Sequence, residues 1–243
     1  MAISNLNRQN DQPAYVLHTY PFKETSLVVE LLTRDFGRVA AVAKGARRPR
    51  SAMRGMLQSF QPLLATWSGK AELKNLYGLE WDEGLLLLQG EALICGFYLN
   101  ELLLRLLPRE DAHATLFDYY KHTLRVLAAG QQLPASLRRF ELKLLQEMGY
   151  AVPLERDEHD APIEPGRIYY YVAERGAVSG GQQTRYEIGV KLTGKTLLDM
   201  ARDDYADAQT QQQGKQLMRM LLAHYLGDKP LHTRQLLIDL QGL

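Results

Sequence analysis

The feature that most constrains the fold is a change of periodicity at about Glu83. Before that point, short runs rich in Val, Leu and aromatic residues are separated by Pro, Gly and Asp, a pattern typical of β-strands. Strands are expected at Ala14–Tyr20, Leu27–Thr33, Arg38–Ala43, Leu63–Trp67 and Leu73–Leu79. Five short strands with a longer third connection match a small Greek-key barrel such as the OB-fold. Residues 1–12 are polar and predict a frayed terminus.

After Glu83, apolar residues recur at helical spacing. The first helical segment ends at Pro108, and further helices are expected at Ala112–Ala128, from Pro134 to Gly149, at Thr196–Ala201, at Ala208–Leu226 and from Pro230 to about Leu240. Short strands are expected at Ile168–Val172 and Tyr186–Val190. The sequence therefore predicts an α+β chain, with an OB-fold β-barrel at residues 1–82, a helical bundle domain at 83–152 and 193–243, and a small irregular insert at 153–192.

Positive charge is concentrated in one stretch of the predicted barrel. Between Phe36 and Ala71 there is no Asp or Glu, although the whole chain has a formal net charge of only +1. A local excess of cations suits phosphate backbones, because neutralising them releases condensed counterions. The alternative is a solvated loop with a chance run of arginines. We expect nucleic-acid contacts at Arg38, Lys44, Arg47, Arg48, Arg50 and Arg54.

Aromatic residues of the first domain offer a second route to nucleic acid. Their rings can stack on unpaired bases, but small barrels also fill their interiors with such rings. We expect most of them to lie in the core and one or two near the rim. The residues are Tyr15, Tyr20, Phe22, Phe36, Phe60, Trp67, Tyr77 and Trp81.

A phosphate-loop pattern, G-x-x-x-x-G-K-T, spans Gly189–Thr196. That loop must leave a buried parallel strand and open a helix within an α/β sheet. No strand is expected after Thr196, so a nucleotide-binding enzyme is only the alternative interpretation. Thr193 capping a short helix explains the residues better.

Other chemistry has no specific support in the residues. The six histidines lack metal-ligand spacing, and the lone Cys95 excludes an intrachain disulfide framework and fits a reducing cytoplasm. No uninterrupted apolar run is long enough to cross a bilayer. We expect no enzymatic activity, no metal and no cofactor.

A second basic surface is predicted on the helix that follows Pro134. Arg138 and Arg139 precede Phe140, and arginine heads beside exposed apolar side chains suit a short acidic peptide that ends in an apolar residue. The alternative, favoured by the residues alone, is a surface helix whose arginine stems shield its core.

Short motifs along nearly the whole chain resemble the bacterial RecO family of DNA repair proteins. The motifs are Tyr15–His18, Glu24–Leu27, Gly37–Val39, Ala43–Arg47, Leu57–Leu63, Tyr98–Leu102, Leu137–Glu141, Tyr225–Gly227 and Lys229–Leu231. The resemblance implies an N-terminal OB-fold followed by a helical domain, in a cytoplasmic, nucleoid-associated protein.

The resemblance also implies a function, that of a non-enzymatic recombination mediator. Such proteins bind single- and double-stranded DNA, anneal complementary strands, work with RecR, engage the acidic C-terminal tail of single-stranded DNA-binding protein (SSB) and help load RecA. The SSB-tail pocket is expected at Arg138, with Arg139, Phe117 and Tyr120 as further candidates. Many relatives carry a four-cysteine zinc module, but Tyr150–Gly180 contains no Cys, so zinc is not expected here. A protein–protein scaffold without direct DNA binding is the remaining alternative.

Overall fold

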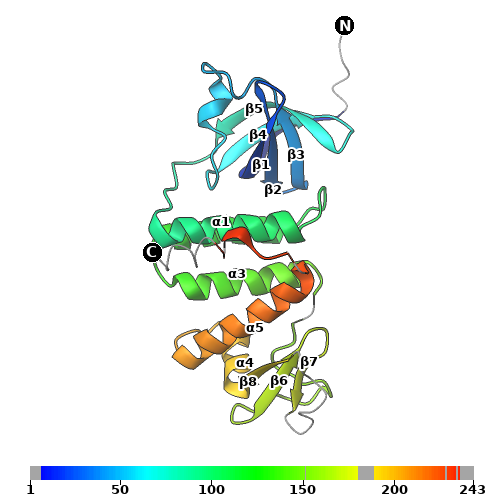
Figure 1. Ribbon diagram of the computed structural model, residues 1–243, viewed down its shortest axis with the longest axis vertical. Coiled ribbons are helices and arrows are strands. Elements are labelled where there is room, and N and C mark those ends of the chain that lie inside the picture. Colours follow the sequence, from blue (N-terminus) through cyan, green and yellow to red (C-terminus); the bar gives the residue numbers. More distant parts are fainter. Residues whose placement is uncertain (1–6, 151, 180–188, 228, 234, 236–243) are drawn as a thin grey trace. The chain divides into compact units, whose positions relative to one another are not determined.

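The computed structural model describes residues 7–150, 152–179, 189–227, 229–233 and 235 (Figure 1). The chain packs as two compact units, and each is described by itself. The first unit comprises residues 1–131 together with 231–243, and the second comprises residues 132–230.

The first unit contains a closed five-stranded barrel, as predicted. Its strands are β1 (Arg8–Phe22), β2 (Ser26–Thr33), β3 (Gly37–Ala43), β4 (Leu63–Ser68) and β5 (Leu73–Trp81). They close in the order β1-β2-β3-β5-β4, with β3 and β5 parallel and the other pairs antiparallel. Alternate side chains fill the interior, among them Val29, Leu31, Leu63 and Trp67. The fold class predicted from the sequence, an OB-like barrel followed by helices, is confirmed.

The barrel begins earlier than the sequence indicated. Arg8 pairs with Ser68 and Gln9 with Trp67, so the prediction of a frayed terminus was wrong for residues 8–12. Closing the barrel requires β1 to pair with β4 as well as with β2. Ladder hydrogen bonds use the backbone, so polar residues can supply this pairing without an apolar pattern.

Two helices complete the described core of the first unit, α1 (Gly90–Leu106) and α2 (Ala114–Ala128). A buried amide joins them to the barrel, because the Asn100 Nδ2 group donates to the Leu17 carbonyl at 2.9 Å and its Oδ1 accepts from the Tyr120 hydroxyl at 2.5 Å. A polar group buried at this depth needs such partners to offset its lost hydration.

The second unit combines helices with a small antiparallel sheet. The helices are α3 (Leu133–Glu147), α4 (Gly194–Ala201) and α5 (Ala208–Leu226). The sheet has the order β7-β6-β8, from β6 (Ile168–Val172), β7 (Gly176–Ser179) and β8 (Val190–Thr193).

The strand predicted at Tyr186–Val190 overlaps the described strand β8 only at Val190, since β8 runs from Val190 to Thr193. Residues 186–188, and most of the helix expected up to Leu240, lie outside the described residues. Among the helices that the structure describes, none combines the length and apolarity of a membrane span.

Candidate nucleic-acid interface

The connection between β3 and β4 is seated on the barrel by apolar side chains. Met53, Met56 and Leu57 pack against the barrel core, and a short 3-10 helix, η2 (Ala52–Gly55), holds the first of them. Turn hydrogen bonds shape the segment before η2, including the Arg48 amide to the Gly45 carbonyl at 3.0 Å. Apolar packing and turn hydrogen bonds therefore fix most of this loop, and the Arg47 Nη1 group adds one hydrogen bond to the Glu24 carbonyl at 3.4 Å.

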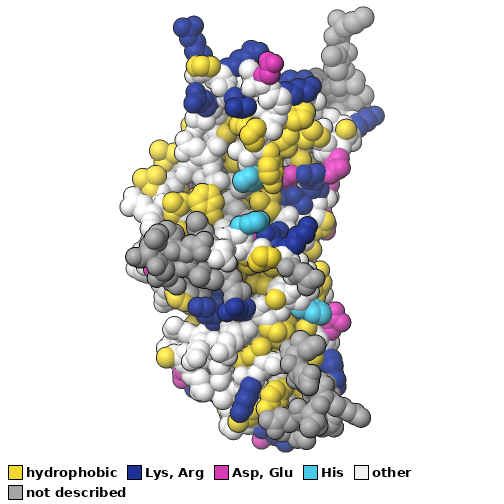
Figure 2. Space-filling model, in the orientation of Figure 1, with side chains coloured by type: hydrophobic (Ala, Val, Ile, Leu, Met, Phe, Trp, Pro, Cys, Tyr) yellow, Lys and Arg dark blue, Asp and Glu magenta, His cyan; other side chains and the backbone are white. Residues whose placement is uncertain are grey.

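The charged side chains of this loop point into solvent. Lys44, Arg47, Arg48, Arg50 and Arg54 are all exposed, and no carboxylate pairs with any of them within the part of the chain that the structure describes. We call these five residues the basic loop. Figure 2 shows Lys and Arg side chains gathered over this end of the barrel, on the face in view. Five of the six predicted nucleic-acid contacts thus lie together on one surface element.

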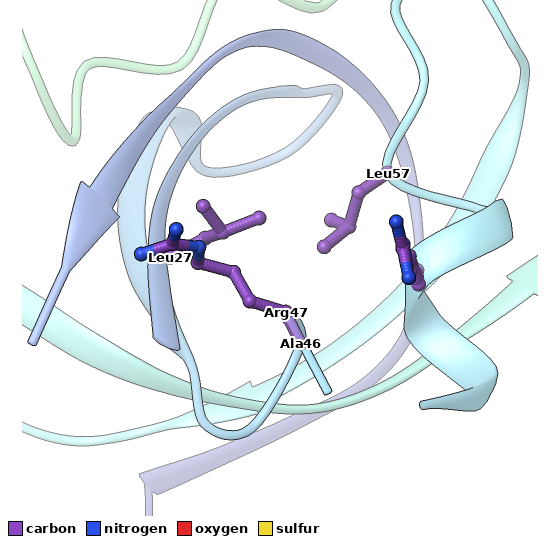
Figure 3. A pocket seen from close by; sticks show the side chains of 5 residues that line it. Leu27, Ala46, Arg47 and Leu57 are labelled. Atoms are coloured by element: carbon purple, nitrogen blue, oxygen red, sulfur yellow. The ribbon is translucent and has the colours of Figure 1, made fainter. Parts of the chain in front are cut away.

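The basic loop also forms the rim of a pocket of about 280 Å³. Leu27, Ala46 and Leu57 supply apolar walls, and Arg47 and Arg54 line the same hollow (Figure 3). The Arg47 backbone amide bonds the Thr25 carbonyl at 2.9 Å, which fixes this part of the loop against the β1–β2 turn. The sequence did not predict this pocket, because Leu27 comes close to the loop residues only when β2 pairs with β3 in the barrel.

Several cations elsewhere in the first unit are neutralised by carboxylates. Arg105 pairs with Glu101, Lys74 with Glu110, and both Lys121 and Arg125 with Glu83, at 2.6–2.7 Å. Hydrogen bonds from Lys121 and Arg125 lower the pKa of Glu83, so this carboxylate stays ionised and compensates them. The basic loop differs from these sites because its charge is left uncompensated.

Arg38 does not belong to the basic loop. Its side chain is only 15% exposed, Nη1 pairs with Glu30 at 2.9 Å, and Nε donates to the Leu107 carbonyl at 2.9 Å. Arg109 contacts the other oxygen of Glu30 and also bonds Glu72. Arg38 therefore joins the barrel to the segment after α1 and offers no free guanidinium to a ligand.

The predicted SSB-tail residues fall into two groups. Phe117 and Tyr120 are buried in the first unit, where both rings pack against Tyr15, so they support α2 on the barrel. Arg138 and Arg139 lie on α3 in the second unit. Arg138 is 12% exposed and pairs with Glu141, while Arg139 pairs with Asp203 at 2.6 Å and lies over the Tyr205 ring.

The phosphate-loop pattern adopts a different structure. Its β8 strand pairs antiparallel with β6, and a side chain at Gly194 would meet the Glu164 carbonyl oxygen at 2.0 Å. Lys195 bonds Asp199 at 2.5 Å and Asp207 at 2.9 Å, and these carboxylates raise the pKa of Lys195. Thr193 accepts from the Thr196 amide, which confirms it as the cap of α4. Among the described residues, no group of His, Cys, Asp and Glu could hold a metal ion.

Two family models cover the chain almost completely. Residues 8–84 match "Recombination protein O N terminal", and residues 87–235 match "Recombination protein O C terminal". The chain belongs to the RecO family. It is 54% identical to the DNA repair protein RecO of Nitrosospira multiformis, over 97% of this chain and 98% of that protein. The RecO of Dechloromonas aromatica is 52% identical, over 98% of both chains.

This RecO-family chain thus carries the family's two domains with a basic loop on the first. The boundary between the two family models, at residues 84–87, coincides with the change of periodicity near Glu83. The models also place the barrel, and with it the basic loop, entirely within the N-terminal match. The family resemblance seen in the sequence is confirmed.

The Glu30–Arg38–Arg109 contact generates a stability prediction. Glu30 is 3% exposed, so Glu30→Ala leaves Arg38 largely buried without its counter-ion, and we expect the free energy of unfolding to fall by about 3–5 kcal/mol. Glu72 contacts the same Arg109 but is exposed, so Glu72→Ala should cost less than about 1 kcal/mol. Urea denaturation of both variants checks this. Equal losses would show that the buried pair contributes nothing special.

Proposed function

We propose that this RecO-family protein is a non-enzymatic recombination mediator that binds single- and double-stranded DNA and anneals complementary strands. With RecR and SSB, it promotes RecA loading on gapped DNA of the cytoplasmic nucleoid. The observation that carries the DNA-binding part is the basic loop, whose five cations are exposed and lack carboxylate partners among the described residues. Its RecR, SSB and RecA partners follow from the family.

Annealing has an electrostatic requirement that the basic loop meets. Two complementary strands repel each other through their phosphates, and cations that contact both backbones lower this repulsion. Lysine and arginine heads that bind phosphates leave base edges free to pair. Because phosphate contacts carry no sequence information, this mode of binding suits a protein that must act at any sequence.

The loop's fixed backbone matters for this role. Met53, Met56 and Leu57 hold the loop on the barrel, so its arginines are presented from a rigid base. Less conformational entropy is then lost when phosphates bind, because only side chains must be ordered. Neutralising the arginines should therefore weaken DNA binding without unfolding the barrel.

The direct test is the triple substitution of Arg47, Arg48 and Arg50 by Ala. We expect weaker binding to single- and double-stranded DNA, and a plot of log K against log salt whose slope is less steep by about 2–3, since each lost phosphate contact removes about 0.7–0.9. Fluorescence anisotropy across a salt series measures this. The annealing rate should fall in the same variant.

A matched control comes from the second unit. Arg156, Arg167 and Arg175 are also exposed, but each has a carboxylate partner there, Asp160, Glu164 and Glu158 respectively. Their triple substitution by Ala removes the same formal charge and should leave the salt slope unchanged. If both triple variants shift the slope alike, net charge governs binding and the basic loop has no special part.

The SSB-tail site is proposed at Arg138 and Arg139. Both arginines are held in place by carboxylates, so an incoming acidic tail would exchange for Glu141 or Asp203 as their partner. Arginine suits this exchange, because its planar head bonds carboxylates through two parallel donors. The Tyr205 ring beneath Arg139 adds an aromatic surface close to this charge.

A simple charge reversal at Arg138 would place two acids side by side in a buried position, so a neutral pair is the better variant. Arg138→Gln combined with Glu141→Gln keeps a polar contact while removing the guanidinium. We expect at least about a tenfold loss of affinity for an SSB-tail peptide, with DNA affinity unchanged. Isothermal calorimetry measures it, and Arg167→Gln serves as the control. Full peptide affinity in the double variant would mean that the site lies elsewhere.

The nucleotide-enzyme alternative makes an opposite prediction about Lys195. Because Lys195 is bound to two carboxylates and the preceding strand β8 is antiparallel to β6, we expect no saturable binding of ATP with magnesium in either the native protein or Lys195→Ala. An equilibrium titration with a fluorescent ATP analogue checks this. Saturable binding that Lys195→Ala abolishes would restore the enzyme hypothesis.

A further inference from the structure

Several aromatic rings of the barrel are buried, whereas Tyr20, Tyr77 and Trp81 are exposed, and Tyr77 is the most exposed of these three. Trp67 is 2% exposed inside the barrel, and Phe36 packs edge-on against it at 5.5 Å between ring centroids. The Tyr77 side chain on β5 is 55% exposed. Exposing a large ring of this kind gives up the stability that its burial would supply.

A β-bulge directs Tyr77 outward. Trp67 on β4 pairs with Leu76, whereas the preceding residue, Thr66, pairs with Gly78, so Tyr77 is the extra residue between the two pairs. Bulges bend a strand and re-aim a side chain, and they are over-represented beside functional sites. At Gly78, a built side chain would meet no atom within 4 Å, so the surface beside the Tyr77 ring is open.

Cations lie near this ring. The Arg8 guanidinium lies 5.4 Å from the ring centroid. On the neighbouring strand, Ala43 at the end of β3 pairs with Leu76 in parallel register, and Lys44, the first residue of the basic loop, follows at the strand end next to the segment that carries Tyr77. An open aromatic face with nearby cations has the composition of a stacking site for unpaired bases.

Two nearby carboxylates favour one position of the nucleic-acid backbone relative to Tyr77. Asp11 bonds Thr66, the partner of Gly78, and Glu80 follows two residues later on β5; both are exposed. These charges repel phosphates, so the nucleic-acid backbone is favoured on the side of Lys44 and the basic loop. An acidic peptide would meet the same repulsion without gaining a base stack, which favours a nucleic acid as the ligand.

We propose that Tyr77, with Arg8 and Lys44 nearby, is a stacking site for one base of single-stranded nucleic acid. The inference rests on the proposed DNA-binding function and adds to it a preference for unpaired bases. Paired bases stack on each other and leave no face for Tyr77, whereas a single strand offers one. The basic loop supplies the sequence-independent phosphate contacts, and Tyr77 supplies the distinction between single and double strands.

The test separates base stacking from charge by comparing an oligothymidylate with an abasic oligomer that has the same number of phosphates. We expect the full-length protein to prefer the oligothymidylate, and Tyr77→Ala to weaken that complex by about fivefold or more while leaving abasic affinity unchanged. Tyr77→Phe should behave like the native protein, because it keeps the ring. Tyr77→Leu keeps an apolar residue that strands tolerate and should behave like Tyr77→Ala, so the result does not depend on one variant folding.

Tyr20 provides the matched control, because it is 46% exposed on the same barrel but packs against His18 at 4.4 Å between ring centroids. Tyr20→Ala should leave the preference for bases intact. The inference is overturned if Tyr77→Ala and Tyr77→Leu keep that preference, if they weaken both oligomers equally, or if Tyr20→Ala removes it as well. Failure of the native protein to bind either oligomer at low salt would instead refute DNA binding itself, and the stacking site with it.

Discussion

In the basic loop, apolar side chains hold the backbone on the barrel, and no carboxylate among the described residues pairs with the five cations. Loops rich in arginine are often fixed by ion pairs, which neutralise the charge that they carry. Here Met53, Met56 and Leu57 pack against the barrel core instead, and the stretch from Phe36 to Ala71 contains no acid. The charge density at this end of the barrel is a consequence of both facts together.

Arg38 shows the opposite use of the same residue type. Arg38 lies in the same acid-free stretch, but it forms an ion pair with Glu30 on the adjacent strand β2. Because Glu30 is buried, two arginines are needed to satisfy both of its oxygens, and Arg109 supplies the second contact from beyond α1. The network joins strands to the helical segment of the first unit, which explains why this charge is unavailable to a ligand.

The second unit illustrates why a motif needs its structural context. Gly189–Thr196 has the letters of a phosphate loop, but β8 is a short strand of a three-stranded antiparallel sheet. Gly194 is required by the close approach of the Glu164 carbonyl, and Lys195 is bound to Asp199 and Asp207. Gly194 and Lys195 therefore have structural roles in this unit, and neither role requires a bound phosphate.

Local patterns alone determined the five strands apart from residues 8–12 of β1, helices α2 and α5, the Thr193 cap and the position of the basic loop, because periodicity, turn residues and charge runs are properties of neighbouring residues. Only the tertiary structure decided which side chains are free. Arg38 is neutralised by Glu30, which Arg109 also binds. Tyr120 is buried against Asn100 and Tyr15, and Tyr77 is turned outward by a bulge whose partner strand is β4. Burial and ion pairing depend on contacts between residues far apart in the chain, which no local pattern specifies.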